Sequence, residues 1–470
     1  MANLHTVEKI GGTSMSRFGE LMDNILIGKR SGAELYNRIF VVSAYGGITN
    51  LLLEDKKTGA PGIYGLFAAG DSDWELKLAE TRNRMIEYNR SFESIGLDQT
   101  VADNFVNERM DGIRDSLRNI LKLRTYGHFR PEDYLPATRE FLSAVGEAHS
   151  AFNAVEILRK HGVNAVFIDL SGWKENESES IEENIMRHLN GLNFAECMPI
   201  VTGYVKCADG IMNRFDRGYS EITFSKLAVV THACEGIIHK EFHLSTGDPK
   251  LMGADRVKTI GYTNFDIADQ LADMAMEAIH PKASKEMERN DISIRVKNAF
   301  DPEHPGTLIS RNYVSPTPRI DMICGRNDIV AIEIFDSEMV GQSGYDHRIT
   351  EILSKHKISY IAKNTNANTI THYVSEKCST LKACIEELEK TFNTSARMTT
   401  RRVAIIGVIG SNMKIPGFLA KASAALSNAN INVLSLDQCM RQVNMQFIIE
   451  RDDFQQAQIA LHRKLVENID

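Results

Sequence analysis

Short apolar runs alternate with amphipathic stretches over the N-terminal part of the chain. This alternation is typical of strands joined by helices, and it predicts an α/β fold with a mostly parallel sheet between helical layers. Predicted strands cover residues 38–44, 163–169, 198–205, 236–244 and 292–298, after a first strand that closes at Lys9. Apolar residues at helical spacing predict helices over 140–159 and 265–281. We therefore predict one α/β domain over residues 1–310.

Residues 71–135 interrupt this alternation. They form a long, charged, helical pattern with no strand signal. We interpret this region as a helical excursion from the sheet that serves as a lid or an interface.

The pattern changes after four prolines between positions 302 and 318. Residues 320–395 are expected to form a strand, a helix, two strands and a helix, and residues 400–470 repeat that order. A polar hinge over residues 393–402 joins the two copies. The sequence thus predicts two copies of one βαββα unit, with exposed strand edges that argue against a monomer.

Composition argues against several classes of protein: nucleic-acid-binding, disulfide-rich and membrane proteins. The chain has 470 residues, 43% of them hydrophobic, and 54 basic against 62 acidic residues give a net charge of −8. No basic cluster is dense enough for a nucleic-acid face. Seven cysteines without a CxxC pair fit a reducing compartment. Because we find neither a signal core nor an apolar run near ~20 residues, we expect a cytoplasmic protein without a membrane segment.

Two predicted strands end in glycine and hydroxyl residues. Lys9 is followed by "GGTS", and the second strand continues into "SAYGGITN" with Ser43 and Thr49. Glycines let backbone amides approach an anion, and lysine adds a point charge. Neighbouring parallel strands end at one edge, where ligands bind. Ordinary strand-to-helix turns remain the alternative, and the chain carries neither a P-loop nor a GxGxxG motif after a strand.

Four further residues are candidates for a functional role. Glu147 lies in the apolar stripe of the helix 140–159 and could receive a ligand ammonium, although periodicity alone favours a solvated helix residue. Arg217 could grip a carboxylate with two parallel hydrogen bonds. Ser220 could equally be a helix cap with Glu221 in the first turn. His239 and His243 are four apart, but their order is not HExxH and the run is predicted to be a strand, so we reject a metal site there.

These pieces resemble a family. "KIGGTS", "VVSAYGGITN", "SAVGE", "DRGYSE" and "STGDPK" occur in the order and spacing of the aspartokinases, members of the amino-acid-kinase superfamily. The two terminal repeats resemble the ferredoxin-like ACT domains of that family. The spelling of "SAYGGITNLLLEDKKTGAPGIYG" and "DRGYSEITFSK" is most similar to the aspartokinases associated with ectoine synthesis.

The resemblance implies an enzyme that makes 4-phospho-L-aspartate from L-aspartate and MgATP, with Mg²⁺ held mainly by ATP and no dedicated metal ligands. It implies catalytic roles for Lys9 and Glu221. The implied substrate residues are Ser43, Thr49, Glu147, Arg217 and Ser220. The implied nucleotide residues are Gly11, Gly12, Thr13, Ser14, Thr246, Asp248 and Lys250. The implied effector residues are Asn432, Gln438 and Asn444.

The sequence departs from the family pattern at several of these motifs. Ile10 replaces a phenylalanine, and "DRGYSE" replaces "GRGGSD", so that Tyr219 stands where a glycine is usual. Lys240 stands near the position of a nucleotide-motif aspartate. Glu277 replaces a lysine that normally faces the nucleotide phosphates. A carboxylate ~4 Å from a phosphate charge costs about 4 kcal/mol at an effective dielectric near 20. We therefore hypothesise that Glu277 points elsewhere.

If so, Lys250, Lys282 or Lys285 supplies the missing cation. The family also implies a homodimer or homotetramer and an amino-acid effector at the ACT repeats. Two alternatives remain open at this point. One is a relative that phosphorylates another carboxylate, carbamate or nucleotide, and the other is an amino-acid sensor that kept the fold and lost catalysis.

Overall fold

The computed structural model describes residues 5–215, 218–274, 276, 278–392 and 396–468. The chain forms two compact units. The first comprises Met1–His243 and Ile279–Arg311, and the second comprises Leu244–Ala278 and Asn312–Asp470. The domain boundaries at 1–310, 320–395 and 400–470 stay a prediction.

The first unit is built on a sheet whose strands run in the order β3-β4-β2-β1-β5-β7-β8. Neighbouring strands are parallel from β3 to β7, and β8 is antiparallel to β7. The strands are β1 (Thr6–Ile10), β2 (Arg38–Val42), β3 (Ala165–Ile168), β4 (Met198–Thr202), β5 (Glu235–Lys240), β7 (Ile294–Asn298) and β8 (Thr307–Ser310). Lys9 of β1 lies between Val41 of β2 and Ile238 of β5. The predicted α/β class with a mostly parallel sheet is confirmed.

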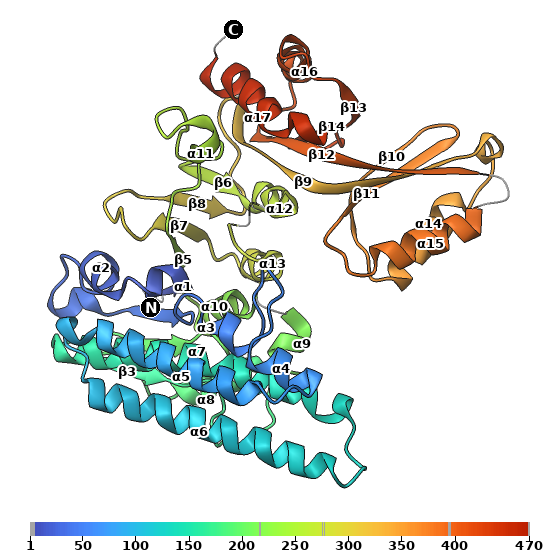
Figure 1. Cartoon of the computed structure of the whole chain (residues 1–470). Coiled ribbons are helices and arrows are strands. Elements are labelled where there is room, and N and C mark those ends of the chain that lie inside the picture. Colours follow the sequence, from blue (N-terminus) through green and yellow to red (C-terminus); the bar gives the residue numbers. More distant parts are fainter. Residues whose placement is uncertain (1–4, 216–217, 275, 277, 393–395, 469–470) are drawn as a thin grey trace. The chain divides into compact units, whose positions relative to one another are not determined.

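Helices cover this sheet, and the long helices α5, α6 and α7 lie side by side (Figure 1). α7 packs on β3 and β4, and α10 packs on β1. The helices are α1 (Gly12–Met15), α2 (Phe18–Leu21), α3 (Ile48–Leu52), α4 (Ile63–Ala69), α5 (Trp74–Ser91), α6 (Gln99–Arg124), α7 (Pro131–Lys160), α8 (Ile181–Leu189), α9 (Ile211–Phe215), α10 (Tyr219–Val230) and α13 (Pro281–Arg289). Residues 71–135, all of them described, contain helices and turns but no strand, as predicted.

The second unit contains an antiparallel sheet in the order β10-β11-β9-β12-β14-β13. Its strands are β9 (Arg319–Phe335), β10 (Tyr360–Thr365), β11 (Thr369–Ser375), β12 (Arg397–Ser411), β13 (Val433–Asp437) and β14 (Asn444–Glu450). The helices of the two copies are α14 (Tyr345–Lys355), α15 (Leu381–Phe392), α16 (Phe418–Asn428) and α17 (Phe454–His462). The unit also holds α11 (Pro249–Met252), β6 (Tyr262–Asn264) and α12 (Phe265–Asp273). The predicted pair of βαββα copies is confirmed.

The two copies share their longest strands. β9 and β12 pair along most of their length and run through both halves of the sheet (Figure 1). Ile320 and Ile323, at the start of β9, belong to the same core as Ile406 and Phe447 of the second copy. The rest of β9, from Val330 onward, packs in the core of the first copy. One strand thus contributes to two hydrophobic cores.

Several predicted elements have other bounds in the structure, and the helix predicted over 140–159 begins earlier, at Pro131. The helix predicted over 265–281 ends at Asp273 as α12, and α13 begins at Pro281. Met274 and Ala278 are buried although neither lies in a helix. A helical conformation is also disfavoured at the residue before a proline, which here is His280. The strand predicted to reach residue 244 ends at Lys240.

The polar hinge predicted between the two copies also differs. Residues 397–402 are part of β12 and pair with β9. Their polar side chains face solvent while the backbone hydrogen bonds are satisfied by β9, so a polar sequence does not prevent a strand here. Residues 393–395 lie outside the described part of the chain.

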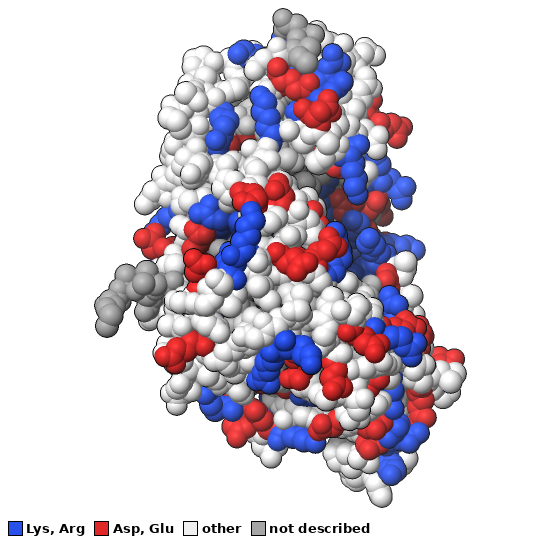
Figure 2. Space-filling model, turned by 90° about the vertical axis from the view of Figure 1, so that its left-hand side faces the viewer, with Lys and Arg blue, Asp and Glu red and all other residues white. Residues whose placement is uncertain are grey.

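Charged residues of both signs are interspersed over the face shown in Figure 2. This agrees with the nearly balanced numbers of basic and acidic residues in the sequence. In the part of the chain that the structure describes, no helix is long and apolar enough to cross a membrane.

Candidate active site

The first predicted strand end is a close junction between β1 and β2. An ideal Cβ on Gly12 would lie 2.4 Å from the backbone oxygen of Ala44, so only glycine fits there. This contact brings the "GGTS" turn against the "SAYGGITN" turn, as the parallel pairing of β1 with β2 requires. The prediction that the two turns share one sheet edge is confirmed.

The "GGTS" turn also meets the end of β5. The Ser14 hydroxyl is buried and donates a 2.7 Å hydrogen bond to Glu241 Oε1. An ideal Cβ on Gly11 would lie 3.9 Å from the same carboxylate oxygen and 4.0 Å from Lys9 Nζ. Thr13 is exposed beside them. A lysine and a carboxylate therefore flank the predicted phosphate loop.

Lys9 and Glu221 form an ion pair across the strand end. Lys9 Nζ lies 3.5 Å from Glu221 Oε1, with side chains 13% and 17% exposed. Glu221 also accepts a hydrogen bond from the backbone amide of His280. Burial opposes ionisation of Glu221, but the charges of Lys9 and Lys240 and the His280 amide outweigh it and hold its pKa below the usual range. Glu221 is therefore ionised at neutral pH.

Glu147 is buried at the same edge, on α7. The Ser220 hydroxyl, from the first turn of α10, donates a 2.6 Å hydrogen bond to Glu147 Oε1. Burial raises the pKa of Glu147 to about 8, although Ser220 and the charge on Lys9 favour the ionised form. A buried carboxylate whose charge is not fully balanced by the protein suits a ligand that carries a positively charged group. The solvated-helix interpretation of Glu147 is wrong.

The turn over residues 43–49 is fixed from several sides. Ser150 of α7 donates to the Ser43 carbonyl, and the Ser43 amide bonds Ile10. Tyr88 of α5 donates to the Gly46 carbonyl, while Ser16 accepts from the Gly46 amide. Thr49 lies in α3, one turn further on. The helical excursion thus supports this turn directly.

A second buried ion pair lies within the sheet. Arg38 of β2 donates to both carboxylate oxygens of Glu8 at 2.7 and 3.1 Å, and His239 of β5 lies 2.7 Å from Glu8. Burial opposes the charge on Glu8, but Arg38 and His239 lower its pKa below the usual range. The three side chains tie β1 to β2 and β5. His239 and His243 have separate partners, since His243 bonds Asp301.

Glu140, on α7, anchors the segment from Tyr204 to α9. Its carboxylate accepts hydrogen bonds from the Tyr204 hydroxyl at 2.9 Å and the Asn213 amide at 3.1 Å. The Tyr204 ring packs edge-on against Tyr219, 5.7 Å between centroids. Tyr219 directly precedes Ser220, which bonds Glu147. The tyrosine that departs from the family pattern is therefore part of the packing that supports Ser220.

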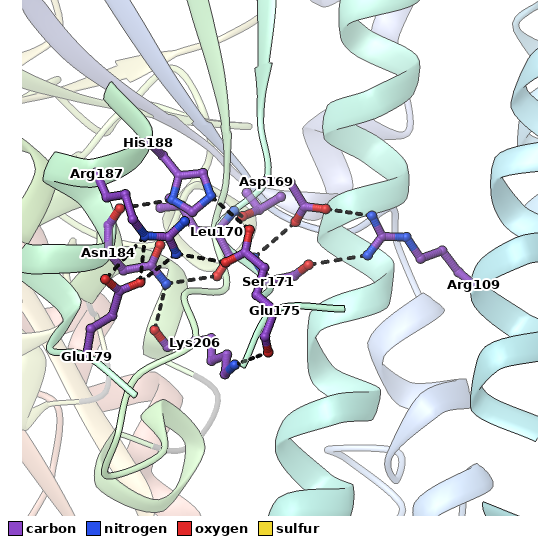
Figure 3. A network of polar contacts seen from close by, with 11 residues as sticks. Arg109, Asp169, Leu170, Ser171, Glu175, Glu179, Asn184, Arg187, His188 and Lys206 are labelled. Carbon is purple, nitrogen blue, oxygen red and sulfur yellow. Dashed lines mark hydrogen bonds and ion pairs between the residues drawn. The ribbon is translucent and has the colours of Figure 1, made fainter. Parts of the chain in front are cut away.

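Figure 3 shows how the chain after β3 and β4 is held. Arg109 of α6 donates to Asp169 at 2.5 Å, and Arg187 of α8 bonds Glu175 and Glu179. Asn184 donates to the Lys206 carbonyl, and Lys206 Nζ donates to the Glu175 carbonyl. This network fixes the segment after β3 and ties it to Lys206, two residues beyond Tyr204.

Three predicted nucleotide residues lie in the second unit. Thr246 is buried, and its hydroxyl lies 3.0 Å from His462 Nε2. Asp248 is the N-cap of α11 and accepts from the Lys250 amide. The side chains of Asp248 and Lys250 are exposed. We call Thr246, Asp248 and Lys250 the nucleotide segment.

The predicted effector residues differ in burial. Asn432 is exposed before β13, and Gln438 is half-buried after it. Asn444 of β14 is buried and donates to Gln270 of α12 at 3.0 Å. Asn444 therefore supports the packing of α12 on the sheet.

Arg217 and Glu277 lie outside the described residues, as does Asp216. Of the lysines proposed to replace the family lysine, Lys282 donates to the Arg214 carbonyl and lies 4.9 Å from the Phe215 ring centre. Lys250 and Lys285 are exposed. Which lysine supplies the cation stays a prediction.

Sequence reasoning missed Glu241, Glu140 and Tyr204. Each becomes informative only when the sheet order and the loop after β4 are known. The single local signal is at Glu241, which directly follows an apolar strand, as Lys9 closes the first one.

The chain matches two family models. Residues 5–298 match the amino acid kinase family, and residues 406–465 match an ACT domain. It is 48% identical to the aspartate kinase Ask_Ect of Stutzerimonas stutzeri over 466 residues, covering 99% of this chain and 98% of that protein. The fold resembles E. coli aspartokinase III solved with aspartate and ADP (TM-score 0.72, 22% identity, 98% and 99% of the chains covered). It also resembles the same protein solved with lysine and aspartate (TM-score 0.71, 22% identity, 99% and 100% covered). Its sequence motifs, its strand-end site and these matches lead to one conclusion: the chain belongs to the amino acid kinase family and is an aspartate kinase.

Proposed function

We propose that the strand-end cluster, defined as Lys9, Ser14, Glu147, Ser220 and Glu221, is the site at which aspartate is phosphorylated. The observation that carries this proposal is the buried Glu147–Ser220 pair beside the Lys9–Glu221 ion pair in one unit. Glu147 suits the substrate ammonium, and Lys9 suits a phosphoryl oxygen. Ser43 and Thr49 line the neighbouring turn and are assigned to the aspartate.

The reaction needs positioning more than acid–base chemistry. An oxygen of the aspartate β-carboxylate attacks the γ-phosphorus of ATP, and the bond to the oxygen that leaves with ADP breaks, so no proton has to move. Lys9 and the amides of Gly11 and Gly12 would neutralise charge on the transferred group. Glu221 holds the Lys9 ammonium in place before the phosphoryl group arrives.

We further propose that Mg²⁺ enters with ATP. Within the described residues, no group of three or more His, Cys, Asp or Glu side chains is arranged to hold a metal ion. A Mg²⁺ ion that keeps phosphate oxygens and waters as ligands fits this donor set. When bound, the ion would neutralise phosphate charge.

The nucleotide segment is assigned to ATP because of the family resemblance and the cap at Asp248, which orients α11. The ACT-type repeats are assigned to an amino-acid effector. E. coli aspartokinase III has been solved with lysine, which makes lysine the first effector to test. We also propose a cytoplasmic homodimer or homotetramer, in which the edge strands of the antiparallel sheet contribute to the contact between subunits.

The decisive experiment is a steady-state assay with aspartate and MgATP, with and without lysine and threonine. Hydroxylamine should trap an acyl phosphate only when both substrates are present. A panel of other carboxylates, carbamates and nucleotides separates this activity from that of related kinases. Equal turnover of another carboxylate would contradict the aspartate assignment.

Arg217 provides a mutational test. Because an arginine binds a carboxylate through charged hydrogen bonds, Arg217→Ala should raise the KM for aspartate about 10- to 100-fold. The KM for ATP should change little. An unchanged KM for aspartate would remove Arg217 from the substrate site.

The pathway is a separate proposal. The motif spelling and the likeness to Ask_Ect support a role in ectoine synthesis. A host that lacks its own aspartate kinases but carries the ectoine enzymes should make ectoine only when it receives this chain.

A further inference from the structure

One buried histidine joins the end of the chain to the nucleotide segment within the second unit. His462, the last residue of α17, is fully buried. Its Nε2 lies 3.0 Å from Thr246 Oγ1, and its Nδ1 lies 2.9 Å from Glu467 Oε1. Thr246 and His462 are 216 positions apart, so the fold alone brings them together.

The chemistry of Glu467 sets the direction of one of these hydrogen bonds. A carboxylate oxygen accepts, so Glu467 accepts the Nδ1–H of His462. When Nε2 carries no proton, it accepts from the Thr246 hydroxyl. Thr246 Oγ1 in turn accepts from the backbone amide of Lys258 at 3.1 Å. Consecutive hydrogen bonds thus connect Glu467, His462, Thr246 and the Lys258 amide.

The contact is tight in shape as well as in hydrogen bonding. An ideal Cβ on Gly247 would lie 3.2 Å from His462 Cδ2 and 3.1 Å from Met252 Cγ. Glycine at this position lets the imidazole lie directly against the backbone of the segment. α11, which carries Lys250, also packs on α17.

Backbone hydrogen bonds make Thr246 a junction. Its amide donates to the Lys258 carbonyl, and its carbonyl accepts from the Ile323 amide of β9, both at 2.9 Å. Its side chain meets His462. The start of the nucleotide segment is therefore held by the shared sheet and by the last helix of the second βαββα copy.

We infer that His462 is a positioning residue through which the second ACT-type repeat sets the affinity for ATP. This inference rests on the proposed role of the nucleotide segment. It goes beyond that role, because it places an ATP-affinity determinant in the core of the C-terminal repeat. A shift of α17 against the sheet would change the KM for ATP and leave the KM for aspartate nearly unchanged.

The test compares two buried histidines. His462→Ala should raise the KM for ATP about tenfold, the size expected for one lost neutral hydrogen bond, with kcat and the KM for aspartate within about twofold. His462→Gln keeps an acceptor for Thr246 and should restore part of the affinity. The matched control is His372→Ala, because His372 is 1% exposed on β11 in the other copy. It should lower the thermal unfolding temperature without raising the KM for ATP.

Thr246→Val tests the same hydrogen bond from the other side and serves if His462→Ala does not fold. The double variant should be less than additive in the KM for ATP. An equal effect of His462→Ala and His372→Ala on the KM for ATP would overturn the inference. Lys250→Ala separates the two levels of the proposal. If Lys250→Ala weakens ATP binding and His462→Ala does not, only the inference fails. If Lys250→Ala has no effect, the nucleotide assignment fails and the inference with it.

Discussion

The strand-end cluster and the nucleotide segment differ in how their charged groups are held. In the cluster, Lys9, Glu147 and Glu221 come from three elements around one sheet, and each is buried or nearly so. In the segment, Asp248 and Lys250 are exposed on a helix of four residues. The charges of the cluster are thus fixed by the core of a unit, and those of the segment by local turns.

Under the proposed functions, this difference separates the groups that act on the phosphoryl group from those that set the affinity for ATP. Opening the cluster would require disruption of parallel strands and buried ion pairs, which costs close to the global stability of the unit. A short exposed helix opens at much lower cost. Groups that stabilise the transferred phosphoryl need fixed positions, whereas a segment that tunes affinity benefits from a setting that neighbouring elements can change.

Lys9→Ala is the most direct test of the proposed role of the strand-end cluster. Loss of one preorganised donor to a developing charge costs about 10²–10³ in kcat, and we expect at least that loss. Thermal unfolding should stay close to that of the parent protein. The matched control is Lys29→Ala, which removes a lysine whose side chain is 88% exposed and pairs with Glu303 at the surface. Turnover near normal in Lys9→Ala would refute the assignment of the cluster.

The next test is Glu147→Gln, which removes the charge but keeps the shape. We expect the KM for aspartate to rise about 10- to 100-fold, as for a lost charged hydrogen bond. Since burial raises the pKa of Glu147 to about 8 in the free enzyme, the carboxyl is largely protonated at pH 6.5. The parent KM should therefore fall as the pH rises and level off above about 8. The variant should show a flat profile over this range.

The same shift predicts a change in stability. Below the unfolded-state pKa, Glu147 is protonated in both states and burial costs little. Between that value and about 8 the folded protein binds more protons than the unfolded chain, so the free energy of unfolding falls as the pH rises. Urea unfolding of the unliganded protein from pH 5 to 9 should show this decline, and Glu147→Gln should reduce it. A steeper decline in the variant would contradict the assigned pKa.

Sequence patterns predicted the parts of the fold that depend on local periodicity. The alternation of apolar runs fixed the parallel sheet, and the glycine-rich turns after the first two strands indicated a shared edge. They did not reveal that β5 lies on the other side of β1, because strand order is a tertiary property. Glu241 was missed for that reason.

Sequence patterns also failed to predict which polar side chains are buried. Glu147 lies in an apolar stripe, and periodicity alone favoured a solvated residue, whereas the structure buries it against Ser220. The family resemblance, not the pattern, identified it. Helix α12 was extended too far because apolar residues after Asp273 keep helical spacing while the chain has already left the helix.

The smallest effect comes from the packing that supports Ser220. Tyr204→Phe removes the hydroxyl that donates to Glu140 and leaves the ring against Tyr219. The packing of Tyr204 on Tyr219 should then hold Ser220 less firmly. The KM for aspartate should therefore rise about threefold to tenfold, the range for one hydrogen bond. The KM for ATP should stay constant, because the nucleotide segment is anchored in the other unit. Tyr126→Phe, at a tyrosine that is 72% exposed, controls for the substitution itself. An equal rise in both KM values would mean that Tyr204 supports the whole first unit and not the aspartate site alone. The proposed separation between the strand-end cluster and the nucleotide segment would then fail.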